Sequence, residues 1–109
     1  METERRRAPR YRFIAEAEVN EILTDTKLRA RTSDLSIGGC FLDMLNPCLK
    51  GTEIIVRILH AGTFFTARGR VAFVVPNIGM GLAFTHVDGD QISLLRQWLL
   101  DVSHATSKD

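Results

Sequence analysis

Apolar and polar residues alternate from Phe13 onward, and this alternation constrains the fold more than any other feature. The apolar set is Phe13, Ala15, Ala17 and Val19, and the polar set is Glu16, Glu18 and Asn20. Because successive side chains of a strand point to opposite faces, the pattern predicts a half-buried strand. After a polar break at residues 24–26, Leu28, Ala30 and Thr32 alternate with Lys27, Arg29 and Arg31. A second strand therefore returns as a hairpin.

Four further stretches have the composition of strands, and turn-forming residues separate them. They span residues 40–45, 53–60, 63–75 and 78–85. The stretch 53–60 is rich in β-branched residues, as expected of a buried strand. The stretch 63–75 is long for one strand, and Gly69 within it predicts a bend or a bulge. Phe64, Phe65, Phe84 and Trp98 are expected to be core residues, because they stand in apolar rather than basic surroundings.

The apolar period changes after Asp88 to that of a helix. The apolar stripe consists of Leu94, Leu95, Trp98, Leu99 and Val102. We expect the helix at about 90–102, a barrel with its helix over 13–102, and a frayed tail at 103–109. The whole pattern predicts an all-β-dominated fold, a six-stranded antiparallel barrel. Closure would remove exposed edges, and the C-terminal α-helix would plug or cover one face.

Composition limits the class of protein. A chain of 109 residues with 45% hydrophobic and 25% charged residues is typical of one ordinary globular domain. No apolar run reaches the roughly 18–20 residues that cross a bilayer. The charged first residues lack the apolar region of a signal peptide, so we expect a cytoplasmic location without membrane insertion. Cys40 and Cys48 are then expected to be reduced and structural, and no metal site is expected around them.

Charge is unevenly distributed along the chain. Residues 1–12 carry five arginines against two glutamates, whereas residues 13–109 carry nine basic and eleven acidic residues. A near-neutral body with a basic arm favours a small, discrete anionic ligand, because long nucleic acid is usually met by a basic stripe across a folded face. The charge of the body therefore argues against a small barrel that binds single-stranded nucleic acid, which is the third and least favoured reading.

Residues 1–12, the arm, contain a cluster of arginines at Arg6, Arg7 and Arg10. Pro9 disfavours a helix at the residue before it, so the arm is expected to be extended and flexible. The planar fork of arginine matches two phosphate oxygens and equally the O6/N7 edge of guanine, so a cluster can bind both. Taken alone, however, a basic N-terminus is more often a solvated tail.

A second motif is Asp34-Leu35-Ser36-Ile37-Gly38-Gly39, and it lies in a stretch, residues 33–39, that is expected to form a turn. Asp and Ser bond nearby backbone N–H groups and glycine fits positive φ, so an ordinary turn would look the same. In a binding site, the Asp34 carboxylate could accept hydrogen bonds from the N1–H/N2–H₂ edge of guanine or from arginines of the arm. The Ser36 hydroxyl and the bare glycine backbone could approach a phosphate or a sugar.

Together, the two motifs resemble the signature of the PilZ domain family, R-x-x-x-R followed after one hairpin by D-x-S-x-x-G. The matching residues are Arg6 and Arg10, then Asp34, Ser36 and Gly39. Looser matches at residues 70–74 and 79–84 and in the closing helix extend the resemblance over about residues 5–100. The resemblance implies a six-stranded PilZ barrel of the Greek-key or split type that binds cyclic di-GMP (c-di-GMP), often as an intercalated pair of molecules.

The resemblance also implies a role for each matching residue. Arg6 and Arg10 would grip phosphates and guanine edges, with support from Arg7. The other guanine and its phosphate would be held by the hairpin residues Asp34, Ser36, Gly38 and Gly39. Two further residues are candidate contacts. Arg5 lies at a junction that in the family can influence nucleotide stoichiometry. Phe73 stands where many relatives carry Trp, and it would either stack on a base or only pack.

The function that follows is nucleotide sensing by a stand-alone, single-domain adaptor, not an enzyme. Its three histidines are scattered along the chain, with no Ser-His-Asp order and no obvious pair of carboxylates. We expect c-di-GMP as the ligand, an unidentified downstream protein as the partner, no nucleic acid, and a monomer or weak homodimer. The main alternative is a PilZ-like module that binds proteins without nucleotide, and the intact motifs argue against it.

Overall fold

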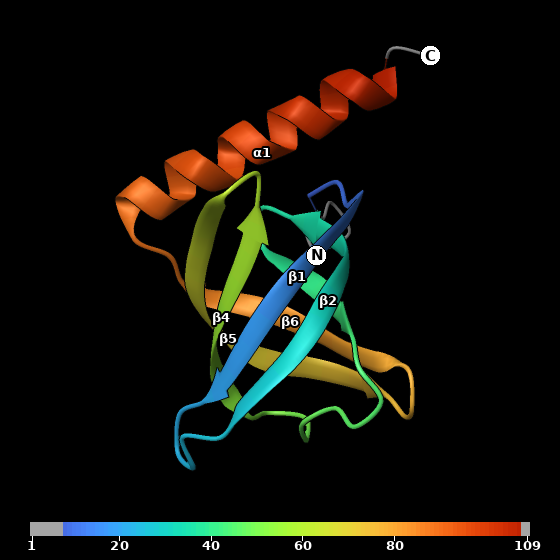
Figure 1. Ribbon diagram of the computed structural model, residues 1–109, viewed down its shortest axis with the longest axis vertical. Coiled ribbons are helices and arrows are strands. Elements are labelled where there is room, and N and C mark those ends of the chain that lie inside the picture. The colour runs from blue at the N-terminus through green and yellow to red at the C-terminus, as the bar shows by residue number, and fades with distance from the viewer. Residues whose placement is uncertain (1–7, 108–109) are drawn as a thin grey trace, which may run out of the picture.

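A closed sheet of six antiparallel strands forms the body of the molecule (Figure 1). The structure is a computed structural model that describes residues 8–107. The elements are β1 (Tyr11–Glu21), β2 (Lys27–Ser36), β3 (Gly39–Asp43), β4 (Glu53–His60), β5 (Thr63–Val75), β6 (Gly79–His86) and α1 (Gly89–Ser107). Around the barrel the order is β1-β2-β3-β6-β5-β4, and β4 pairs back to β1. The barrel and terminal helix that the sequence predicts are confirmed.

The alternation that begins at Phe13 fills the barrel interior. Every second side chain of β1 from Phe13 to Val19 is buried, and the residues between them are exposed. The largest fully buried side chains come from the other strands and from α1, and they include Leu35, Leu42, Ile54, Ile58, Phe65, Met80 and Leu95. Because burying one such side chain contributes about 1.5–3 kcal/mol, this shared interior is what holds the six strands together.

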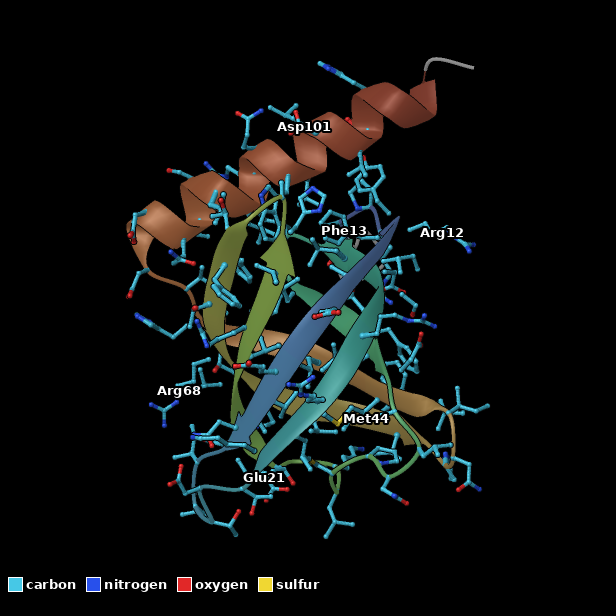
Figure 2. The ribbon with its side chains drawn as sticks, in the orientation of Figure 1. Arg12, Phe13, Glu21, Met44, Arg68 and Asp101 are labelled. Atoms are coloured by element: carbon cyan, nitrogen blue, oxygen red, sulfur yellow. The ribbon has the colours of Figure 1, made fainter. Side chains whose placement is uncertain are left out.

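Helix α1 covers one end of the barrel (Figure 1). The Trp98 ring stacks on Phe13 with 5.5 Å between ring centroids and meets His60 edge-on at 5.0 Å. Figure 2 shows Phe13 beneath the helix at this end. Gln91 Oε1 accepts a hydrogen bond from the backbone N–H of Thr66 at 2.7 Å, which ties the start of the helix to β5. Within the part of the chain that the structure describes, no helix is long and apolar enough to cross a membrane.

Two elements extend further than the sequence pattern indicates. β1 begins at Tyr11 rather than Phe13, because Tyr11 and Arg12 pair in register with Leu35 and Asp34 of β2. The last two residues of the expected arm therefore belong to the sheet. α1 continues to Ser107, past the expected end at 102, since no proline or glycine follows to stop it.

Two expectations for β5 have opposite outcomes. The β5–β6 register shifts between Arg68 and Gly69, so an irregularity is present where Gly69 predicts one. Phe64, by contrast, is not a core residue as its apolar surroundings suggest. It faces outward with 39% of its surface exposed, because the neighbouring Phe65 takes the inward position.

Both cysteines are free and buried. Burial is the main cause that raises the pKa of the Cys40 thiol, the nearby Asp34 charge adds to it, and Arg10 opposes it. The Cys48 thiol donates to Glu21 Oε2 at 3.3 Å. Burial, followed by this hydrogen bond, raises the pKa of Cys48 to about 11. Thiols held protonated in this way are poor nucleophiles, so a packing role fits both.

We expect the free energy of unfolding to fall as the pH rises from about 9 to about 11. The Cys48 thiol ionises near its ordinary pKa of 9.0 in the unfolded chain but stays protonated to about 11 when folded, so ionisation favours the unfolded state. Urea titrations across this pH range measure the effect. Because burial also raises the pKa of Cys40, which contributes to the same decline, Cys48→Ala, which keeps Cys40, is the control. An equally steep decline in that variant would contradict the assignment.

Candidate functional site

The Asp34–Gly39 motif forms a tight hairpin rather than a long turn. Asp34 lies two residues before the end of β2, Ser36 is its last residue and Gly39 opens β3, so only residues 37 and 38 connect the strands. This corrects the expected turn over residues 33–39. Asp34 pairs with Arg12 on one side and with Phe41 on the other, and these two ladders outweigh the local turn preference of Asp and Ser.

Ser36 fixes the connection between β2 and β3. Its buried hydroxyl donates to the carbonyl oxygen of Gly39 at 3.3 Å and accepts from the backbone N–H of Gly38 at 3.3 Å. The hydroxyl therefore serves the backbone of the hairpin, as Ser side chains commonly do in turns.

The two glycines of the hairpin meet different demands, and neither has the positive φ that the sequence suggests. A Cβ added to Gly39 would lie 2.0 Å from the carbonyl oxygen of Leu82, so β6 approaches β3 too closely for any side chain. A Cβ on Gly38 would meet nothing within 4 Å. Gly39 is thus required by packing, whereas Gly38 faces open space.

Asp34 and Arg10 meet at the mouth of this hairpin. Arg10 Nη1 lies 3.4 Å from Asp34 Oδ2, which is the contact between arm and carboxylate that the motif spacing suggests. The Asp34 side chain is 28% exposed, yet its Oδ1 is buried and has no hydrogen-bond partner among the described residues. A buried carboxylate oxygen that lacks a hydrogen-bond donor costs free energy. The Asp34 Oδ1 atom is therefore a candidate acceptor for a donor group of a ligand. Arg12 is exposed and points away from the barrel (Figure 2).

A shallow cleft of about 360 Å³ lies beside this pair, on the outer side of the barrel. It is lined by Ala8, Arg10, Ser36, Gly38, Gly39, Ala72, Phe73, Leu82 and Ala83. Four expected site residues, Arg10, Ser36, Gly38 and Gly39, therefore share one cleft with the candidate Phe73. The lining residues of β6, Leu82 and Ala83, lie in the looser family match at residues 79–84, but only the pairing of β3 with β6 brings them to the site.

Phe73 is a wall of the cleft and remains 43% exposed. A Cβ on Gly81 would fall 2.2 Å from the Phe73 ring, so the ring lies directly over the bare backbone of β6. Phe41 stacks beside it at 6.0 Å between centroids. The ring packs on one side, as one of its two expected roles requires, and keeps another side open.

Three expected contacts, Arg5, Arg6 and Arg7, lie outside the described residues. Among residues 8–107, no group of three or more His, Cys, Asp and Glu side chains is arranged to hold a metal ion. The described part of the site therefore offers one cation, one carboxylate, open backbone and an aromatic ring.

Comparison with known proteins places this architecture. A search of curated proteins finds no match. The PilZ domain of CeSA from a cellulose-synthesizing bacterium superposes with a TM-score of 0.71 at 19% identity, covering 89% of this chain and 100% of that chain. The PilZ domain of YcgR from Escherichia coli with c-di-GMP gives a TM-score of 0.77 at 14% identity, covering 94% of each chain. Longer YcgR in complex with c-di-GMP gives 0.80 at 15% identity, covering 95% of this chain and 48% of that chain.

At identities this low, the structural superpositions establish the shared fold alone. The family is established by the match of the sequence to a family profile. The profile of the PilZ domain matches residues 4–101, nearly the whole chain. The chain belongs to the PilZ domain family, a family of non-catalytic c-di-GMP receptors.

Proposed function

We propose that this protein is a c-di-GMP receptor and adaptor that holds the dinucleotide between its N-terminal arginines and the Asp34–Gly39 hairpin. One observation carries the proposal: the buried Oδ1 of Asp34 has no donor among the described residues. The N1–H and N2–H₂ groups of guanine are donors on one edge, and a carboxylate accepts such a pair through its two oxygens. Because Oδ1 is buried, the Asp34 carboxylate would have to turn outward for a bound guanine to supply the missing donor.

Arg10 is suited to exchange its partner for the ligand. Its contact with Asp34 is 3.4 Å long, whereas a firm charge-assisted hydrogen bond measures about 2.7–2.9 Å. Half of the Arg10 side chain is exposed, so the pair contributes little to stability and costs little to open. The guanidinium can then turn to a phosphate or to the O6/N7 edge of guanine.

The other expected residues complete the clamp in different ways. Arg6, supported by Arg7, would bind the phosphates and guanine edges that Arg10 does not reach. Ser36 and Gly39 would act by shaping the hairpin, because the hydroxyl is engaged and the glycine lies against β6. Gly38 would leave room for the ligand to approach the backbone, since nothing lies near it.

The signal would pass to a protein partner through the arm. Ligand contacts with residues 5–10 would hold them against the hairpin, since Tyr11 and Arg12 already pair with β2, and would change the surface beside the end of the barrel that α1 covers. Fixing the backbone costs about 1–2 kcal/mol per residue, and several charge-assisted bonds of about 1.5–3 kcal/mol each can offset that cost. The ordering of a segment by a bound ligand is an established type of switch.

A calorimetric titration of the chain with c-di-GMP tests the proposal. We expect saturable binding with a Kd of about 1 μM or tighter. If binding is no tighter than about 1 mM, the receptor reading fails, and a nucleotide-independent interaction module takes its place. Gel-shift assays with oligonucleotides of increasing length test the alternative that the barrel binds single-stranded nucleic acid. Such a barrel would bind longer strands more tightly and lose affinity as the salt concentration rises.

A further inference from the structure

Most of the basic residues of the barrel are gathered on one outer face, away from the cleft. The face is formed by the outward side chains of four adjacent strands, in the order β2-β1-β4-β5. Its charged residues, here called the basic wall, are Lys27, Arg29, Arg31, Arg57, Arg68 and Arg70 with Glu16, Glu18 and Glu53. Residues 13–109 contain nine basic and eleven acidic residues in all. The wall therefore holds six of those nine cations and only three of the eleven acids, and it is positive on a body that is otherwise acidic.

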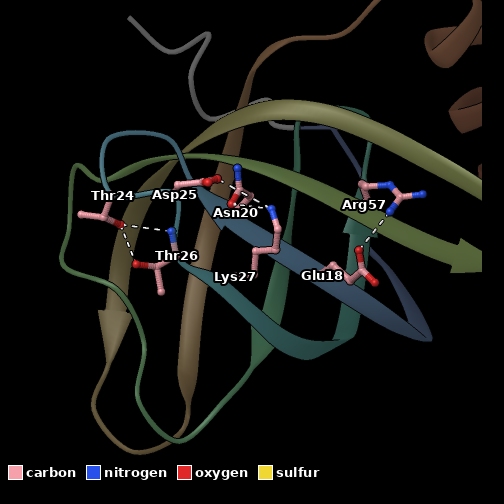
Figure 3. A network of polar contacts seen from close by, with 7 residues as sticks. All are labelled: Glu18, Asn20, Thr24, Asp25, Thr26, Lys27 and Arg57. Carbon is pink, nitrogen blue, oxygen red and sulfur yellow. Dashed lines mark hydrogen bonds and ion pairs between the residues drawn. The ribbon is translucent and has the colours of Figure 1, made fainter.

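The carboxylates of the wall neutralise some of its cations and leave others free. Glu18 Oε1 accepts from Arg57 Nη1 at 3.0 Å, as Figure 3 shows. Glu53 bridges Arg68 at 3.4 Å and Arg70 at 3.1 Å. Hydrogen bonds from these two arginines lower the pKa of the Glu53 carboxyl, so it stays ionised at neutral pH. Two further cations pair with carboxylates outside the wall, Lys27 with Asp25 at 3.7 Å and Arg31 with Asp43 at 3.6 Å. The positive excess therefore comes from Arg29 and from the single Glu53 carboxylate that serves two arginines.

Arg29 is the central unneutralised cation of the wall. It stands opposite Glu18 in the β1–β2 register, but the Glu18 carboxylate turns to Arg57 on the other side. Among residues 8–107, no ion pair or hydrogen bond engages the Arg29 side chain, and the residue is exposed. Its guanidinium is available to a carboxylate from outside the molecule.

Two adjoining hollows of about 440 and 320 Å³ lie on the wall, and Glu18, Arg29 and Arg57 border both. Their floors are apolar: the first contains Val19, Leu28 and Ile55, and the second contains Ala17, Leu59 and Phe64. The Arg57 guanidinium lies 3.9 Å from the centre of the exposed Phe64 ring, which places a cation directly on the apolar floor. Apolar hollows with a cationic rim suit an apolar side chain flanked by carboxylates.

We propose that the basic wall docks an acidic protein segment that carries apolar side chains. The apolar residues would enter the two hollows, and the flanking carboxylates would meet Arg29 and its neighbours. Nucleic acid fits less well, because Glu16, Glu18 and Glu53 interrupt the basic surface and would repel phosphates. None of the nine wall residues lines the cleft beside Asp34, so an acidic segment can bind while the cleft is empty or filled.

The proposal is tested without nucleotide, so its outcome is independent of c-di-GMP binding. The probe is a fluorescein-labelled peptide of Glu and Leu, compared with a counterpart in which Lys replaces Glu. We expect the acidic peptide to bind, the basic one not to bind, and Arg29→Glu to weaken binding about tenfold. Arg96→Glu changes the net charge equally at an exposed position of α1, and it should alter the affinity less than about twofold. Because Arg29 is exposed and pairs with no other described residue, the variant is expected to fold.

Amide chemical shifts of the isotope-labelled protein locate the peptide. We expect the largest shifts on β1, β2 and β4. Shifts centred on α1 or on the β2–β3 hairpin would overturn the proposal, as would equal weakening by Arg29→Glu and Arg96→Glu or no binding of the acidic peptide. Length-dependent binding of a DNA oligonucleotide to the same amides would assign the wall to nucleic acid instead.

Discussion

Replacing Arg10 with Ala is expected to weaken c-di-GMP binding by about a hundredfold or more while the barrel remains folded. The loss has two physical sources. The ligand loses a planar, charge-assisted donor, and the Asp34 carboxylate loses the only cation within contact in the described part of the chain. The fold should persist because the Arg10 side chain is half exposed and precedes β1.

Calorimetry measures the affinity, and circular dichroism with a thermal melt checks the fold. Arg10→Lys keeps the charge but loses the fork, so an intermediate affinity would indicate bidentate recognition rather than a general positive field. Arg29→Ala removes the same charge from the basic wall and should leave the affinity for c-di-GMP within about twofold of wild type. Wild-type affinity in Arg10→Ala, or equal losses in Arg10→Ala and Arg29→Ala, would contradict the assigned role of Arg10.

The barrel could be predicted because the residue pattern within each strand is enough to show that it is a strand and which face is buried. The alternation along β1 and the β-branched residues of β4 depend only on which face of each strand meets the interior, and burial follows that pattern closely. The strands at Glu53–His60 and Thr63–Val75 coincide with the stretches read from the sequence. The prediction that Phe64 is a core residue was wrong. Two adjacent phenylalanines of a strand cannot both face inward, and the sequence does not say which one does.

The candidate site could be predicted only in part, because its geometry depends on distant strands. The motif spacing indicated that arm and hairpin meet, and the contact between Arg10 and Asp34 is present. The residue types of the hairpin suggested a turn, but pairing with β1 and β3 makes Asp34 and Ser36 part of a strand. The unpartnered Oδ1 of Asp34 and the cleft walls from β5 and β6 arise from barrel closure, which no local pattern encodes.

Gly39 illustrates how a motif residue can be required for a reason that the motif hides. In the sequence it is one of two glycines in a turn, and either would fit a need for positive φ. In the structure neither has positive φ, and the difference between them is the distance to β6. The Leu82 carbonyl oxygen that a Gly39 Cβ would strike is backbone, so it cannot move aside as a flexible side chain could.

We therefore expect Gly39→Ala to lower the free energy of unfolding by about 3 kcal/mol or more, since relieving the clash must separate β3 from β6. Gly38→Ala should change stability by less than about 1 kcal/mol, because its Cβ meets nothing within 4 Å and its φ is not positive. Urea denaturation of the two variants measures the contrast, and each is the control for the other. Gly38→Ala should also bind c-di-GMP more weakly than wild type if the ligand approaches the hairpin backbone. Equal stability of the two variants would mean that β6 can yield at Leu82, and that the close approach of β3 and β6 is not what requires a glycine at position 39.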